Sequence, residues 1–189
     1  MSDTNNDFAS ASLTVGQLNA VVKKLGGHEA VLKFLRGELI VSAIKAVAKI
    51  FTLVLSGAKK ASELVREGNY GWVNDWITDE RFPITPHEPT SRMIEFVEFD
   101  HDMSSEQVLA EFTRRGLERP TTEDALQFGI EHPEEQRKRP VVFLHGPVRD
   151  RDGDPDVLVL REDDVQRSLS LCWFDNVWGR DCVFAGVRK

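Results

Sequence analysis

The sequence predicts an α+β protein, with an N-terminal helical unit followed by a strand, two helices and a C-terminal antiparallel β-meander. Apolar residues recur at helical spacing in the first third of the chain, and two capping-box patterns follow in the middle. Four short apolar runs separated by turn residues end the chain. We expect a disordered tail (1–11), a helical unit (12–67), an aromatic- and proline-rich linker (68–90), and an α+β unit (91–189) that ends in a four-stranded antiparallel sheet.

Two short helices are expected to open the helical unit. In LTVGQLNAVVKKLGG, Thr14 can cap the first helix with Gln17 at the capping-box position, and Gly26 and Gly27 end it. HEAVLKFLRGEL then favours a second helix. The pair predicts an αα-hairpin, an arrangement that helix-turn-helix proteins also use.

A third helix is predicted from Ile40 to Arg66. Its apolar residues step by four and three positions: Ile40, Ile44, Val47, Phe51, Val54 and Ala58. The β-branched run IFTLVL keeps a strand open as an alternative for that part. Because the apolar face is wide, we expect the Ile40–Ala58 helix to contact an unknown protein partner or a second copy of the chain.

No membrane span is expected, although the window Leu39–Ser56 approaches the necessary length. Lys45 and Lys49 lie in its middle, and each would cost about 2.5–3.5 kcal/mol at a bilayer centre. The polar N-terminus lacks the pattern of a signal peptide. Only two cysteines occur, Cys172 and Cys182, which suits a reducing compartment, so we expect a cytoplasmic protein.

The chain changes its periodicity after the linker, in which Pro83 prevents a continuous helix. RMIEFVEFD is expected to be a strand. SSEQVLAEFTRRG and TTEDALQFGIEHP are expected to be helices capped by Ser104 and Thr121. The runs PVVFLHGPV, DVLVLRE, RSLSLCWFD and RDCVFAGVRK then predict the meander, and a hairpin across DNVWG would place Cys172 opposite Cys182.

Four aspartates crowd the stretch RDRDGDPD between the first two runs of the meander, and they are the candidate ligands for weakly bound calcium or magnesium: Asp150, Asp152, Asp154 and Asp156. A calcium loop of the EF-hand type needs glycine at position 6 and glutamate at position 12, between two helices. Counted from Asp150, Gly153 falls at position 4 and Glu162 at position 13. The flanks are strand-like, so a polar hairpin turn is the favoured interpretation.

Other chemistries fit the sequence less well. VVFLHGP resembles the oxyanion segment of α/β-hydrolases, but the chain has no G-x-S-x-G nucleophile elbow, and His145 is expected to be a half-buried residue at a strand end. The spacing of the two cysteines matches no common zinc motif. The N-terminal lysines could contact phosphate groups, yet a net charge of −7 and few base-reading side chains make nucleic acid an unfavoured partner.

Several strings also resemble a set of uncharacterised bacterial proteins. LTVGQLNAVVKKLGG, VLKFLRGEL, YGWVNDWIT and HGPVRDRDGDPDVLVL are similar to stretches of hypothetical proteins from the ultra-small bacteria of the candidate phyla. The resemblance covers most of the chain in pieces. It implies a bacterial origin and no activity, cofactor or site residue.

The expected function is therefore that of a cytoplasmic, non-enzymatic binding or interaction protein without a cofactor, since no nucleophile–base set, phosphate loop or metal spacing was found. One alternative is a protein that binds a divalent metal at the acidic turn 150–156, or a metal-dependent enzyme whose acidic pocket would use Asp150, Asp152, Asp154 and His145. A second alternative is weak nucleic-acid binding through the N-terminal basic helices.

Overall fold

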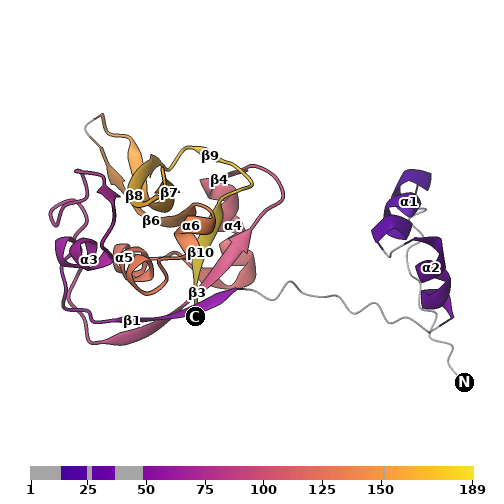
Figure 1. Cartoon of the computed structure of the whole chain (residues 1–189), viewed down its shortest axis with the longest axis horizontal. Coiled ribbons are helices and arrows are strands. Elements are labelled where there is room, and N and C mark those ends of the chain that lie inside the picture. Colours follow the sequence, from indigo (N-terminus) through magenta and orange to yellow (C-terminus); the bar gives the residue numbers. More distant parts are fainter. Residues whose placement is uncertain (1–13, 25–26, 37–48, 151) are drawn as a thin grey trace, which may run out of the picture. The chain divides into compact units, whose positions relative to one another are not determined.

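The computed structural model describes residues 14–24, 27–36, 49–150 and 152–189. The chain divides into two compact units, residues 1–46 and 47–189, and the α+β fold class is confirmed (Figure 1). The first unit holds α1 (Val15–Lys24) and α2 (His28–Leu35). These helices contact each other, as expected for an αα-hairpin, and Gly27 lies between them with φ at +99°.

The second unit is built around one large mixed sheet. Its elements are β1 (Ile50–Leu55), α3 (Ala61–Gly68), β2 (Trp72–Val73), β3 (Thr90–Glu98), β4 (Met103–Ser104), α4 (Ser105–Arg115), β5 (Leu117–Glu118), α5 (Thr122–Glu131), α6 (Glu135–Lys138), β6 (Val141–Arg149), β7 (Pro155–Asp163), β8 (Gln166–Trp173), β9 (Val177–Trp178) and β10 (Val183–Arg188). The strand order is β1-β3-β10-β6-β7-β8-β2, and β5 pairs with β10 beside this path. Strands β4 and β9 form a separate pair.

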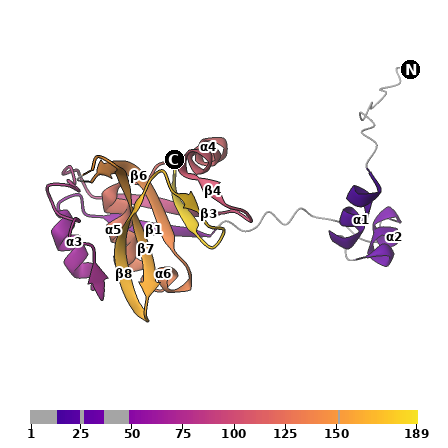
Figure 2. The same cartoon turned by 90° about the horizontal axis from the view of Figure 1, so that it is seen from above.

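Helices cover both faces of the sheet (Figure 2). Phe143 and Leu158 face the core that α3 and α5 share, whereas Leu144 and Val157 face the core beneath α4. Because both faces of β6 and β7 are buried, their sequences VVFL and VLVL are continuous apolar runs rather than alternating ones. The predicted capping boxes at Ser104 and at the start of α5 are both formed.

The helix predicted from Ile40 to Arg66 is wrong over residues 50–55, which form β1, the strand that the run IFTLVL left open as an alternative. Its last part is helical in α3, and residues 40–48 lie outside the described residues. Leu53 and Leu55 are buried, while Ile50 and Val54 are exposed, which is the period of a strand. Strand β1 pairs with β3 along its length. It therefore belongs to the second unit and not to the predicted helical unit 12–67.

The predicted four-stranded meander is correct only for β6, β7 and β8, which pair in antiparallel order. The last strand, β10, lies between β3 and β6 and runs parallel to β6. The hairpin expected across DNVWG is therefore wrong, and Cys172 lies opposite Val157 instead of Cys182. Among the described residues, no helix is long and apolar enough to cross a membrane.

Candidate functional site

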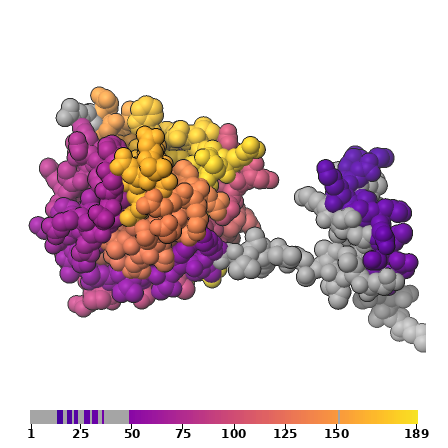
Figure 3. Space-filling view, viewed as in Figure 1, coloured from indigo at the N-terminus to yellow at the C-terminus, as the bar shows by residue number. Residues whose placement is uncertain are grey.

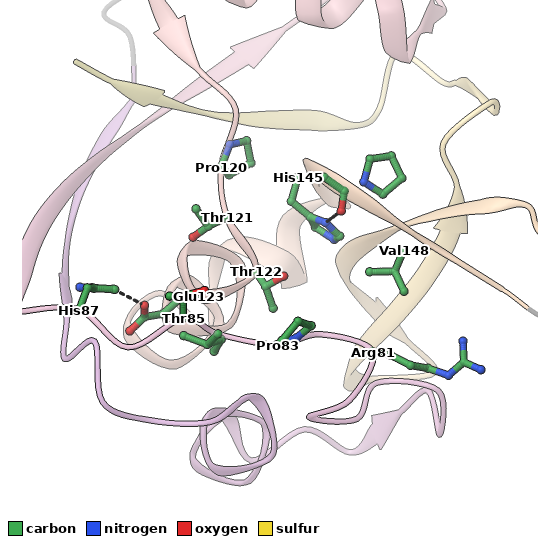
Figure 4. Close-up of a pocket in the computed structure, with 13 residues that line it drawn as sticks. Arg81, Pro83, Thr85, His87, Pro120, Thr121, Thr122, Glu123, His145 and Val148 are labelled. Atoms are coloured by element: carbon green, nitrogen blue, oxygen red, sulfur yellow. Dashed lines mark hydrogen bonds and ion pairs between the residues drawn. The ribbon is translucent and has the colours of Figure 1, made fainter.

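A pocket of about 640 Å³ opens in the second unit between three segments that are distant in sequence (Figure 4). One wall is the stretch 81–87 that leads towards β3, another is the start of α5, and the third is the middle of β6. Prolines from each segment line it: Pro83, Pro120 and Pro147. The pocket therefore has a largely rigid wall, because proline fixes its own backbone φ angle.

A bulge over residues 144–147 of β6 forms one side of the pocket. Phe143 pairs with Leu158 and Val148 pairs with Asp156, so the residues 144–147 lie opposite the single residue Val157. This bulge interrupts the ladder of hydrogen bonds between β6 and β7. Bulges of this kind redirect side chains and are common next to functional sites.

His145 fills the gap that the bulge leaves. Its Nε2 accepts a hydrogen bond from the backbone N–H of Leu158 at 3.0 Å, and its Nδ1 lies 2.6 Å from the carbonyl oxygen of Gly146. These partners assign the proton to Nδ1. Burial and, to a smaller extent, the charge of Arg119 lower the pKa of His145 to about 4. The residue is 1% exposed and lies inside β6, so the expectation of a half-buried residue at a strand end is wrong.

Arg119, the residue after β5, donates hydrogen bonds to the bulge. Its Nε donates to the carbonyl oxygen of Leu144 at 2.8 Å, and its Nη2 donates to that of His145. Two carbonyl groups that the ladder has released are thereby satisfied by one guanidinium. The bulge is thus a braced part of the fold and not a loose loop.

His87 and Glu123 form an ion pair at one end of the pocket, with 2.7 Å between Nε2 and the carboxylate (Figure 4). The other ring nitrogen, Nδ1, lies 2.7 Å from the carbonyl oxygen of Glu88. Both partners are acceptors, so the charged imidazolium satisfies both. The carbonyl of Glu88 and the carboxylate of Glu123 raise the pKa of His87 above its usual value.

The same carboxylate also holds the turn after β1. Glu123 is 3% exposed, and its second oxygen accepts a hydrogen bond from the backbone N–H of Gly57 at 3.1 Å. The backbone N–H of His87 donates to the carbonyl oxygen of Gly57 at 2.9 Å. Gly57 has φ at +66°, and a Cβ atom there would lie 2.0 Å from the carbonyl oxygen of His87, so only glycine fits.

A second buried carboxylate lies next to the first. Asp124 is 0% exposed and accepts hydrogen bonds from the backbone N–H and the hydroxyl of Thr121, at 2.7 and 2.9 Å. Its other oxygen lies 3.4 Å from Nε of Arg92, close enough for an ion pair, and Nη2 of Arg92 donates to the oxygen that Thr121 also contacts, at 3.4 Å. The first turn of α5 therefore contacts both His87 and Arg92, the residues that flank the stretch 88–91.

Both histidines of the pocket are held by protein groups through their rings. All four nitrogen atoms of His87 and His145 face protein groups. The hydroxyl of Thr122, whose side chain extends towards the middle of the pocket in Figure 4, has no hydrogen-bond partner among the described residues. The hydroxyl of Thr122 is therefore a polar group of the lining that can donate to or accept from a bound molecule.

Of the four aspartates predicted as metal ligands, Asp150, Asp152 and Asp154 lie in the turn between β6 and β7, and Asp156 lies in β7 itself. Asp150 turns its carboxylate inwards, and one oxygen accepts the backbone N–H groups of Asp152 and Asp154, each at 2.9 Å. Gly153 has φ at +89°. Burial and then the charges of Asp150 and Asp154 raise the pKa of Asp156. Within the described part of the chain, no three His, Cys, Asp or Glu side chains are grouped to hold a metal ion.

Both cysteines are free thiols that pack against the core under α4. Burial raises the pKa of Cys172, and burial together with Asp181 raises that of Cys182 to about 11. Both thiols are therefore protonated near neutral pH and poorly nucleophilic.

Comparison with protein-family models, curated proteins and solved structures finds no match to this chain. Of the residues expected to form an acidic pocket, His145 lines this pocket and the aspartates of residues 150–156 do not; the stretch 81–87 and the start of α5 were not predicted to take part. The segment PITPHEPT and the acidic pair after Thr121 are the local signals of the pocket, but an acidic first turn is ordinary in exposed helices too.

Proposed function

We propose that the chain is a non-enzymatic binding protein and that the pocket between the β6 bulge and α5 takes a small molecule. The observation that supports binding over catalysis is that all four ring nitrogens of His87 and His145 are occupied by protein partners. The braced bulge and the buried carboxylates supply a preformed wall, which lowers the cost of ordering on binding.

The lining of the pocket indicates the chemistry of the ligand. A volume of about 640 Å³ suits a drug-sized molecule. Ile84, Val148 and the three prolines offer apolar contact, while the hydroxyl of Thr122 offers one hydrogen bond in the middle. The ligand we expect is a mainly apolar molecule that carries a hydrogen-bonding group.

Gly146 gives a direct test of the pocket. It lines the pocket, and a Cβ atom there would meet no atom within 4 Å, so Gly146→Leu adds bulk without strain. We would screen a library of neutral apolar fragments by ligand-observed NMR and thermal shift. A fragment at 100 times its Kd stabilises the wild type by about 2.7 kcal/mol, and we expect Gly146→Leu to lose this stabilisation.

Gly16→Leu is the matched control. Gly16 lies on α1 in the first unit, and a Cβ atom there also meets nothing within 4 Å. This variant should bind the fragments as the wild type does. If no fragment binds the wild type, or if Gly146→Leu binds as well as Gly16→Leu does, the proposal fails.

We also propose a cytoplasmic location. It is supported by two unpaired thiols, Cys172 and Cys182, in a chain with few cysteines. Cell fractionation with a compartment marker tests it, and recovery in a secreted or membrane fraction would contradict it.

A further inference from the structure

Strand β1 ends the main sheet, and among the described residues no strand pairs with its outer edge. The backbone N–H of Phe96 donates to the carbonyl oxygen of Lys49. Lys49 and Phe96 are therefore a hydrogen-bonded pair. In the antiparallel register of β1 and β3, the residues of β1 that bond to β3 are then the odd-numbered ones, Phe51, Leu53 and Leu55. The backbone groups of Ile50, Thr52 and Val54 therefore point outwards, away from β3.

The outer edge also carries exposed apolar side chains. Ile50 is 41% exposed, Val54 is 61% exposed, and Met93, which lies opposite Thr52 on β3, is 43% exposed. Figures 1 and 3 show β1 in purple at the margin and surface of the second unit. The run IFTLVL has no charged residue, so it lacks the lysines that usually protect an edge strand.

We infer that a second copy of the chain pairs with β1, strand against strand and antiparallel, about a two-fold axis at Thr52. From Ile50 to Val54 the residues with outward backbone groups are Ile, Thr and Val. An antiparallel second copy presents the same residues in the order Val, Thr and Ile. In this register Ile50 lies opposite the partner's Val54, and Thr52 lies opposite its own copy. β-Branched residues then face each other at every outward position, with no like charges opposed.

The side chain of Glu131 occupies part of the outer edge of β1 in the single chain. Glu131 accepts the outward N–H of Val54 at 3.2 Å and also the side-chain amide of Gln127 at 2.7 Å. In the pair of strands, the carbonyl group of the partner's Ile50 replaces Glu131 as acceptor, and Glu131 keeps its bond to Gln127. The surface differs from the helix that the sequence predicted for self-association, although it includes part of the same segment.

Cross-linking tests the register. Thr52 and its copy would form a hydrogen-bonded pair with about 5.5 Å between the Cα atoms, a separation that a disulfide can bridge. We expect Thr52→Cys in the full chain to give a covalent dimer after mild oxidation, seen on a non-reducing gel. Ser91→Cys, exposed on the neighbouring strand β3, should match the wild type, which carries Cys172 and Cys182 as background.

Analytical ultracentrifugation tests the association itself. We expect the wild type to show a monomer–dimer equilibrium that Thr52→Lys weakens at least about tenfold, because two ammonium groups would oppose each other at the axis. Ser91→Lys is the matched control and should leave the equilibrium unchanged. A wild type that sediments as a monomer at its highest soluble concentration, no cross-link with Thr52→Cys, or equal effects of the two lysines would each overturn the inference.

Discussion

His87 is the residue whose charge state matters most at the pocket. It contacts Glu123 and the carbonyl oxygen of Glu88, and the nearby Arg92 opposes its charge. Since the attraction prevails, the pKa of His87 is raised in the folded state. Its contribution to stability is present below the unfolded pKa of about 6.5 and is lost as the pH rises through the folded pKa.

We therefore expect the stability difference between the wild type and His87→Gln to be largest at mildly acidic pH and to shrink as the pH rises. Urea-induced unfolding followed by tryptophan fluorescence, repeated across the pH range, gives this difference. His101→Gln is the control, because the pair of His101 with Asp100 lies at the surface, where an ion pair contributes little to stability. A difference that stays constant between about pH 6 and pH 9 would contradict this account.

His145 shows why the site could not be predicted residue by residue. The string VVFLHGPV predicts a strand, and that strand exists. Nothing in the string shows that residues 144–147 bulge, because the bulge depends on the pairing of β6 with β7 and on Arg119, 26 residues earlier in sequence. The role of Glu123 likewise depends on Gly57, which is 66 residues away.

At the level of elements, the hairpin between β6 and β7 was correctly predicted because its turn depends only on residues that are neighbours in sequence. Gly153 supplies the positive φ angle, and Asp150 accepts two backbone N–H groups of the turn. The run IFTLVL does not reveal its strand by local pattern. Its exposed positions Ile50 and Val54 are as apolar as its buried ones, so the alternation of a strand is hidden in the sequence.

Asp150→Ala should destabilise the second unit by about 1–2 kcal/mol, as the loss of a capping side chain does. Asp150→Asn is the matched variant, since its amide oxygen can still accept the N–H groups of Asp152 and Asp154, and we expect a smaller loss. Chemical denaturation measures both. Equal losses in the two variants would show that the charge, and not the acceptor, matters at this position.

The metal alternative for the same hairpin can be tested with the same proteins. We expect millimolar calcium or magnesium not to raise the melting temperature of the wild type, because the carboxylate of Asp150 is already turned to the backbone. Differential scanning fluorimetry with and without each ion measures this. A rise in the wild type that disappears in both Asp150 variants would instead establish a cation site.

At the level of the whole molecule, local pattern predicted that strands exist but not which strands are neighbours. The expected hairpin across DNVWG joined consecutive runs, as short connections usually do. The chain instead passes through β9, which pairs with β4, and returns at the centre of the sheet as β10. Placing β10 between β3 and β6 buries it on both faces, which accounts for the apolar residues Val183, Phe184, Ala185 and Val187.

Arg167 connects the layers of the second unit. It lies on β8, is 9% exposed, and donates to the carbonyl oxygens of Gly68 at the end of α3 and Gly129 in α5. Its Nε donates to the side chain of Gln136 in α6 at 3.2 Å, and its guanidinium lies 4.7 Å from the ring centroid of Tyr70. One side chain thus binds three helices to the sheet.

Arg167→Met should therefore destabilise the second unit by at least about 3 kcal/mol, because each buried acceptor left without a donor costs about 1–3 kcal/mol. Arg167→Lys should lose less, since an ammonium can still donate to part of this set. Arg66→Met, at an exposed position of α3, is the control and should change stability little. Guanidinium-induced unfolding measures all three. A loss below about 1 kcal/mol for Arg167→Met would mean that apolar packing alone holds the helices on the sheet.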